Sequence, residues 1–97
     1  MPTTTDQELA DVRTTAARAV SARAAHVAAR GNFFAVSADF DAGSAEFELA
    51  FGAWEQAARV DACAADASCR AASRVHNRAT FARIDAVRAA NRADVFA

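Results

Sequence analysis

The side chains best suited to chemistry are two cysteines, Cys63 and Cys69, with His76 seven residues after the second. Thiolates and imidazoles are ligands for zinc, but this spacing fits none of the common zinc motifs. A Cys63–Cys69 disulfide requires a turn between them, because six residues of continuous helix separate the two by about 9 Å. The alternative is a pair of small buried hydrophobic residues in a reducing compartment. We therefore expect no metal site and leave the disulfide open.

No group of residues has the pattern of a catalytic site. Ser73 and His76 are three residues apart on a predicted helix, but no glycine-rich turn stands beside them to bind an oxyanion. His26 is interpreted as a partly buried, hydrogen-bonded residue at the edge of a helix face. The acidic run 39–46 lacks the ligand spacing of an EF-hand calcium loop. The chain has no lysine and no tyrosine, so we predict a protein that is not an enzyme and uses no cofactor.

Arginine supplies all the positive charge, and the charge is sorted along the chain. Net charge by segment is +1 for residues 1–30, −6 for 31–68 and +4 for 69–97. In the last segment Arg70, Arg74 and Arg78 recur every four residues and predict a basic ridge on one helix face. We expect this ridge to pair with the acidic second segment or with a partner protein. Nucleic-acid binding is the less favoured alternative, since the net charge of the whole chain is −1.

The composition predicts a single all-α domain. Thirty of the 97 residues are alanine, whereas only three are glycine and one is proline. A capping-box pattern beginning at Thr5 and a stop at Gly31 place the first helix at about 5–30. Residues 31–43 alternate in a strand-like way and are expected to form a non-helical connector.

Two further helices are expected after the connector, at about 44–64 and 67–93. A straight helix across both ranges would turn Phe81 and Ile84 away from the face of Trp54. A break near Asp66 removes this conflict and gives a small three-helix bundle. A helical hairpin, with the last two helices joined, is the alternative.

Large apolar side chains are few, and the most concentrated group is Phe47, Phe51 and Trp54 in the second predicted helix. They are expected to anchor the core, or to anchor an interface if they are exposed. A domain of this size is marginal even with a good core, and alanine contributes little apolar area. We therefore expect additional stability to come from association with another protein or with itself, so that a homo-oligomer is a reasonable expectation.

Two short segments resemble motifs of the WXG100 family, whose members are exported by type VII secretion. One is the run Phe51-Gly52-Ala53-Trp54 behind Phe47, and the other is Phe81-Ala82-Arg83-Ile84-Asp85, which has the aromatic-x-x-x-acid form of the family's tail signal. Residues 39–43 read Asp-Phe-Asp-Ala-Gly and lack the family's Trp-x-Gly turn. The resemblance implies a hairpin that pairs with a second chain and ends in an unstructured tail after Asp85.

The favoured hypothesis is a small non-enzymatic helical protein-binding module that docks on a partner protein or on itself. Its most specific form, by analogy with other short helical proteins, is a phage or mobile-element inhibitor of a host complex. The candidate partner-binding residues are Arg70, Arg74, Arg78, Phe47, Phe51 and Trp54. No apolar run is long enough to cross a membrane. We expect a cytoplasmic location, with export without a classical signal peptide as the alternative.

Overall fold

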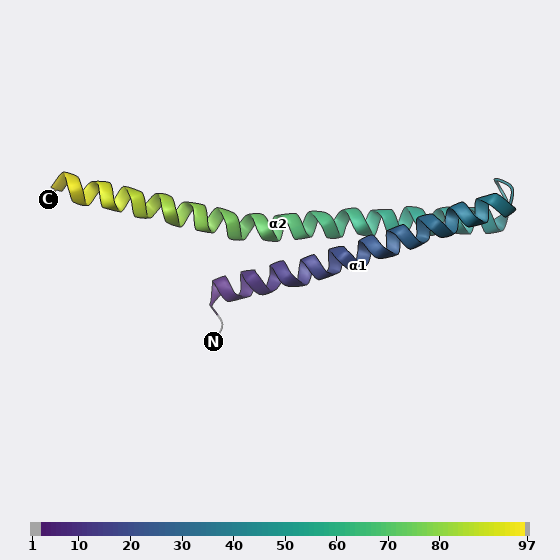
Figure 1. Ribbon diagram of the computed structural model, residues 1–97, viewed down its shortest axis with the longest axis horizontal. Coiled ribbons are helices and arrows are strands. Elements are labelled where there is room, and N and C mark those ends of the chain that lie inside the picture. Colours follow the sequence, from purple (N-terminus) through teal and green to yellow (C-terminus); the bar gives the residue numbers. More distant parts are fainter. Residues whose placement is uncertain (1–2, 97) are drawn as a thin grey trace.

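The computed structural model describes residues 3–96 and consists of two long antiparallel helices (Figure 1). Helix α1 spans Thr4–Asp39 and helix α2 spans Ala45–Phe96. A short turn at 40–44 joins them at one end of the molecule. The hairpin is thin and elongated, with principal extents of 80 × 29 × 14 Å.

Local interactions fix the ends of both helices. Thr3 and Asp6 form a reciprocal capping box at the start of α1, two residues earlier than the predicted Thr5. Ser44 accepts a hydrogen bond from the backbone N–H of Phe47 and so caps α2. Between the helices, Gly43 has a φ of 91°, a conformation that costs side-chain-bearing residues energy.

The predicted connector and the predicted break are both wrong. Helix α1 continues through Gly31 to Asp39, so the connector is residues 40–44 and not 31–43. Helix α2 runs without interruption past Asp66, so the ranges 44–64 and 67–93 belong to one helix. The all-α fold and the hairpin alternative are confirmed, whereas the three-helix bundle is not formed.

The two helices meet along a seam of small residues with a seven-residue repeat. On α1 the least exposed positions alternate at spacings of three and four: Val12, Thr15, Ala19, Ala22, His26, Ala29, Phe33. On α2 they follow the same rule: Phe47, Ala50, Trp54, Ala57, Asp61, Ala64, Ser68, Ala71, Val75. This 3.5-residue period is that of a left-handed coiled coil. Alanine, serine or threonine at nine of these sixteen positions lets the two backbones approach closely.

The seam explains why helix α2 does not break near Asp66. Ala64, Ser68 and Ala71 continue the contact with α1 across that region. Phe81 and Ile84 do not belong to the seam and are 64% and 38% exposed. The direction of the large side chains therefore does change along α2, but the small ones keep the helix against α1.

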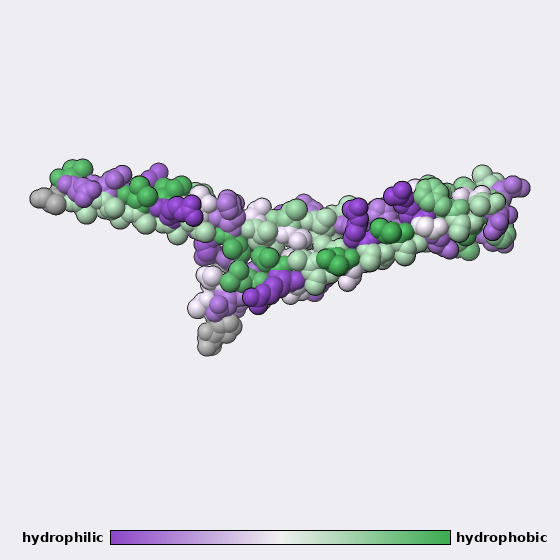
Figure 2. Space-filling model, viewed as in Figure 1, coloured by the Kyte–Doolittle hydropathy of each residue, from purple (hydrophilic) through white to green (hydrophobic). Residues whose placement is uncertain are grey.

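Helix α2 is much longer than α1, and its C-terminal end extends freely beyond the start of α1 (Figure 1). We call residues 82–96 the arm; at 1.5 Å per residue it is about 22 Å long. The arm stays helical past Asp85, which contradicts the unstructured tail that the family resemblance implied. Hydrophobic residues are exposed to solvent on the visible face of both helices and of the arm (Figure 2).

Candidate partner-binding surface

Five aromatic rings gather where the two helices join the turn. The ring centroid of Phe33 lies 5.1 Å from that of Phe47, 5.6 Å from that of Phe51 and 5.1 Å from that of Trp54. Phe34 lies 5.7 Å from Trp54 on the outer side of α1. Tilted and edge-on contacts at these distances are favourable beyond the area that they bury. The three aromatic residues expected from the sequence are thus brought together, with Phe51 still 38% exposed.

A polar relay follows this aromatic cluster along the seam. The indole N–H of Trp54 donates to His26 Nε2 at 3.1 Å, and His26 Nδ1 lies 2.7 Å from Asp61 Oδ2. Indole nitrogen can only donate, so Nε2 must accept and Nδ1 must carry the hydrogen that is donated to Asp61. His26 is therefore hydrogen-bonded through both ring nitrogens, as its position at a face edge suggested.

The relay joins the two helices through side chains that are hydrogen-bonded to one another. An imidazole that acts as a base needs a free nitrogen lone pair directed at a substrate. In His26 that lone pair is occupied by Trp54, and the other nitrogen is engaged by Asp61. Trp54 and Asp61 are one seven-residue repeat apart on α2, so sliding the helices by one layer breaks both bonds. The relay therefore fixes the register of the hairpin.

The three arginines of the basic ridge all contact carboxylates of their own chain. Arg74 Nη2 lies 3.0 Å from Asp11 Oδ2, and Arg78 Nη2 binds Glu8 Oε1. Arg70 pairs at 2.6 Å with Asp66 one turn earlier on the same helix. The acidic partners expected in the second segment, residues 31–68, are thus wrong for Arg74 and Arg78, because the C-terminal half of α2 meets the first turns of α1.

Both cysteines are free and exposed. They lie on one continuous helix, where six residues put about 9 Å between them along the axis. A disulfide between Cys63 and Cys69 of one chain therefore does not form in this fold, and neither thiol is one of the buried hydrophobic residues that the alternative required.

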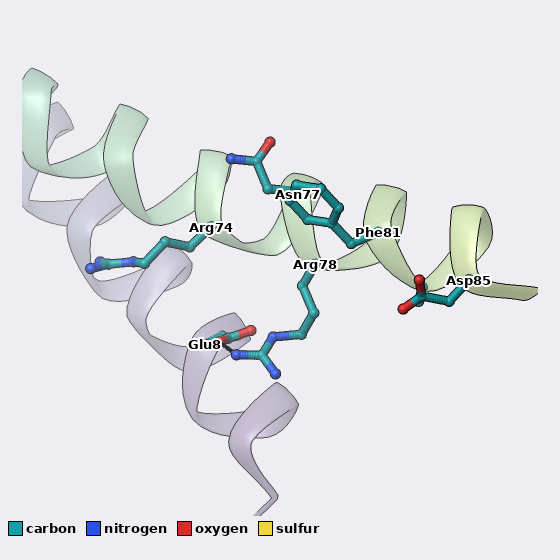
Figure 3. Close-up of a pocket in the computed structure, with 7 residues that line it drawn as sticks. Glu8, Arg74, Asn77, Arg78, Phe81 and Asp85 are labelled. Carbon is teal, nitrogen blue, oxygen red and sulfur yellow. Dashed lines mark hydrogen bonds and ion pairs between the residues drawn. The ribbon is translucent and has the colours of Figure 1, made fainter.

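A groove lies at the fork where α1 begins and the arm leaves it (Figure 3). Its volume is about 520 Å³, and its lining combines Glu8 from α1 with residues of α2 that include Asn77, Phe81 and Asp85. Arg78 reaches across the fork to Glu8 (Figure 3). The second carboxylate oxygen of Glu8, Oε2, is buried and accepts no hydrogen bond within residues 3–96. The fork thus offers an unused acceptor beside an exposed aromatic ring.

Sequence reasoning missed several residues that organise this surface: Glu8, Asp11, Asp61. Each is an acid at or beside a seam position. The signal for them is the seven-residue repeat of the seam, which consists largely of small residues and is therefore inconspicuous in the sequence. Across the described residues, no group of three or more potential ligands is arranged to hold a metal ion. None of the described helices has a stretch long and apolar enough to cross a membrane. No family model, no curated protein and no solved structure matches this chain.

Proposed function

We propose that the chain is a non-enzymatic helical protein-binding module in which the hairpin is a stem and the arm binds a helix of another protein. The observation that carries the proposal is the length difference between the helices. Helix α2 has 52 residues and α1 has 36, so the surface of α2 that binds α1 continues into the arm with no helix against it.

The arm has the side chains expected of a helix-binding surface. Ala82 and Ala89 lie seven and fourteen residues beyond the seam residue Val75 and offer a close approach to a neighbouring helix, with Asp85 between them on the same line. Phe81, at the edge of this line, is 64% exposed. A partner helix that continues the path of α1 would cover these residues.

The other functions considered from the sequence have less support. Nucleic-acid binding by Arg70, Arg74 and Arg78 would have to break three intrachain ion pairs. A WXG100-like role agrees with the hairpin, but the turn lacks Trp-x-Gly and α2 is helical past Asp85. Inhibition of a host complex remains a specific form of the proposal, since a module that occupies a helix-binding site excludes the natural occupant.

Site-specific photocrosslinking in the cells that carry the gene tests the proposed function. A photoreactive residue at Ala82 or Ala89 should crosslink to a protein other than this chain. The same residue at Arg83 or Ala90, on a different face of the arm, is the matched control and should give little product. Equal yields from both faces, or no crosslink to another protein from Ala82 and Ala89, would overturn the proposal.

A further inference from the structure

The two long edges of the hairpin differ in chemistry. One edge is marked by the Asp11–Arg74 ion pair and also carries Arg18 and Arg70. In an antiparallel coiled coil the opposite edge is formed by the residues that directly follow every second seam position. On α1 these are the residues after Thr15, Ala22 and Ala29, and on α2 those after Ala50, Ala57, Ala64 and Ala71. Here those positions and the next outward ones carry small and apolar residues together with three arginines of α1, Arg13, Arg23 and Arg30. The small and apolar residues are Ala16, Val20, Val27 and Phe34 on α1, and Ala58, Ala62, Ala65 and Ala72 on α2. We call this surface the valine–alanine face.

The apolar side chains of α1 on this face project into solvent. Val20, Val27 and Phe34 are spaced seven residues apart and are 71%, 57% and 52% exposed. Val20 and Val27 therefore do not share the seam with Val12. Because a seven-residue spacing returns to one line along a coiled helix, the three form a ridge on α1. The neighbouring strip of α2 between residues 58 and 72 is nearly flat, since alanine occupies all of its positions except Cys69.

We propose that the valine–alanine face binds a second copy of this chain, with the turns of the two hairpins at the same end, so that a four-helix bundle forms. In this two-fold arrangement α1 of one copy lies over α2 of the other, and Val20 and Val27 of the ridge meet the flat alanine strip. The inference extends the proposed binding function to a second surface and rests on it only in treating the chain as a binding module.

The size of the face fits such a dimer. Residues 9–34 and their neighbours on α2 cover a length of about 38 Å, at about 1.5 Å per residue. Two helices about 9 Å apart give a width of about 18 Å. The two copies together would bury about 1,400 Å², within the range of about 1,200–2,000 Å² that stable protein interfaces bury.

Charge selects the same-end arrangement. Between residues 9 and 34, α1 contributes Arg13, Arg23 and Arg30 to this face and no acid. Hairpins with turns at opposite ends would stack α1 on α1 and oppose arginine to arginine, which is unfavourable. With turns at the same end, Arg30 lies level with Glu55 of the other copy, because both fall between the Phe33–Trp54 and His26–Asp61 contacts.

The face is tested by the solution mass of two valine variants. Static light scattering in the presence of reductant should give twice the 10.2 kDa chain mass for the wild type. Val27→Glu should halve this mass, and Val60→Glu, at a similarly exposed valine on the charged edge, should leave it unchanged. Helix content from circular dichroism should be equal in both variants. A monomeric wild type, or equal dissociation of both variants, would overturn the inference.

A charge exchange between copies tests the arrangement. Arg30→Glu and Glu55→Arg should each weaken the homodimer, because each variant opposes like charges twice. Mixing the two variants should restore the dimer as a heterodimer, since both contacts then join opposite charges. No recovery on mixing would overturn the same-end arrangement. Crosslinking from Ala82 is measured separately, so loss of the dimer with the arm crosslinks intact would refute this inference alone and leave the proposed function standing.

Discussion

At the scale of single residues, the polar groups inside this hairpin specify geometry more than they add stability. His26, Trp54 and Asp61 satisfy one another within a seam made mainly of small and apolar residues. Buried polar groups left without partners cost more than their hydrogen bonds contribute. The relay therefore makes other registers of the two helices less stable. The alanine layers of the seam alone would tolerate such shifts, because they resemble one another.

Asp61 and Asp66 provide a matched test of this role. The side chain of Asp61 is 13% exposed, whereas that of Asp66 is 63% exposed and pairs with Arg70 in solvent. Asp61→Ala should lower the free energy of unfolding by about 1–3 kcal/mol, because it leaves His26 Nδ1–H without its acceptor. Asp66→Ala should change it by less than about 1 kcal/mol. Chemical denaturation at neutral pH measures both, and equal losses would contradict the assigned role of the relay.

At the scale of the helices, the sequence predicts helix content well and helix boundaries poorly. Alanine enrichment and the near absence of glycine and proline are enough to predict an all-α chain. The stop predicted at Gly31 failed because a single glycine costs a helix only about 1 kcal/mol, which packing of Phe33 and Val36 against α2 outweighs. The break predicted at Asp66 is wrong because the small residues Ala64, Ser68 and Ala71 hold α2 against α1 there, although the large apolar side chains change direction.

The candidate site was predictable only in part, for the same reason. Phe47, Phe51 and Trp54 stand out by size and do cluster. The acids that bind Arg74 and Arg78 lie more than sixty residues away in sequence. Which acids bind these arginines depends on which end of α2 lies against the start of α1. The net charge of each segment does not indicate this arrangement.

The small residues of the seam should not tolerate enlargement. Ala71 is 2% exposed and sets the distance between the helices. Ala71→Leu adds three carbon atoms where there is no room and should destabilise the hairpin by about 1–3 kcal/mol. Ala53→Leu, at an exposed position of the same helix, is the control and should have little effect. Thermal unfolding followed by circular dichroism compares the two. A tolerated Ala71→Leu would mean that the helices are not in close contact there.

The glycines of the helix and of the turn should respond in opposite directions to the same change. An added Cβ at Gly31 meets nothing within 4 Å, so Gly31→Ala should stabilise α1 by up to about 1 kcal/mol. Gly43 also has open space, but its φ of 91° strains any residue with a side chain. Gly43→Ala should therefore destabilise the turn by about 1 kcal/mol. Denaturant midpoints measure both, and a stabilising Gly43→Ala would show that the turn differs.

At the scale of the whole molecule, the hairpin is incomplete as a globular unit. Among the described residues only Thr15, Ala22, Ala50 and Ala71 are buried. In a pair of helices each helix covers only one strip of the other's surface. Most apolar side chains outside these strips therefore face solvent, whatever the sequence. The thin core that composition predicts is therefore a property of the architecture as well, and a second hairpin is the simplest addition that supplies the missing half of a bundle.

The overall length of the particle distinguishes the ways in which two hairpins can pair. One chain is 80 Å long, and the arm accounts for about 22 Å of that length. Hairpins with turns at the same end place both arms at one end, so the maximum dimension of the dimer should stay close to that of one chain. Hairpins with turns at opposite ends place an arm at each end and lengthen the particle by about 22 Å. Small-angle X-ray scattering resolves this difference, and a dimer of about 100 Å would rule out the pairing of Arg30 with Glu55 while leaving the valine–alanine face as its interface.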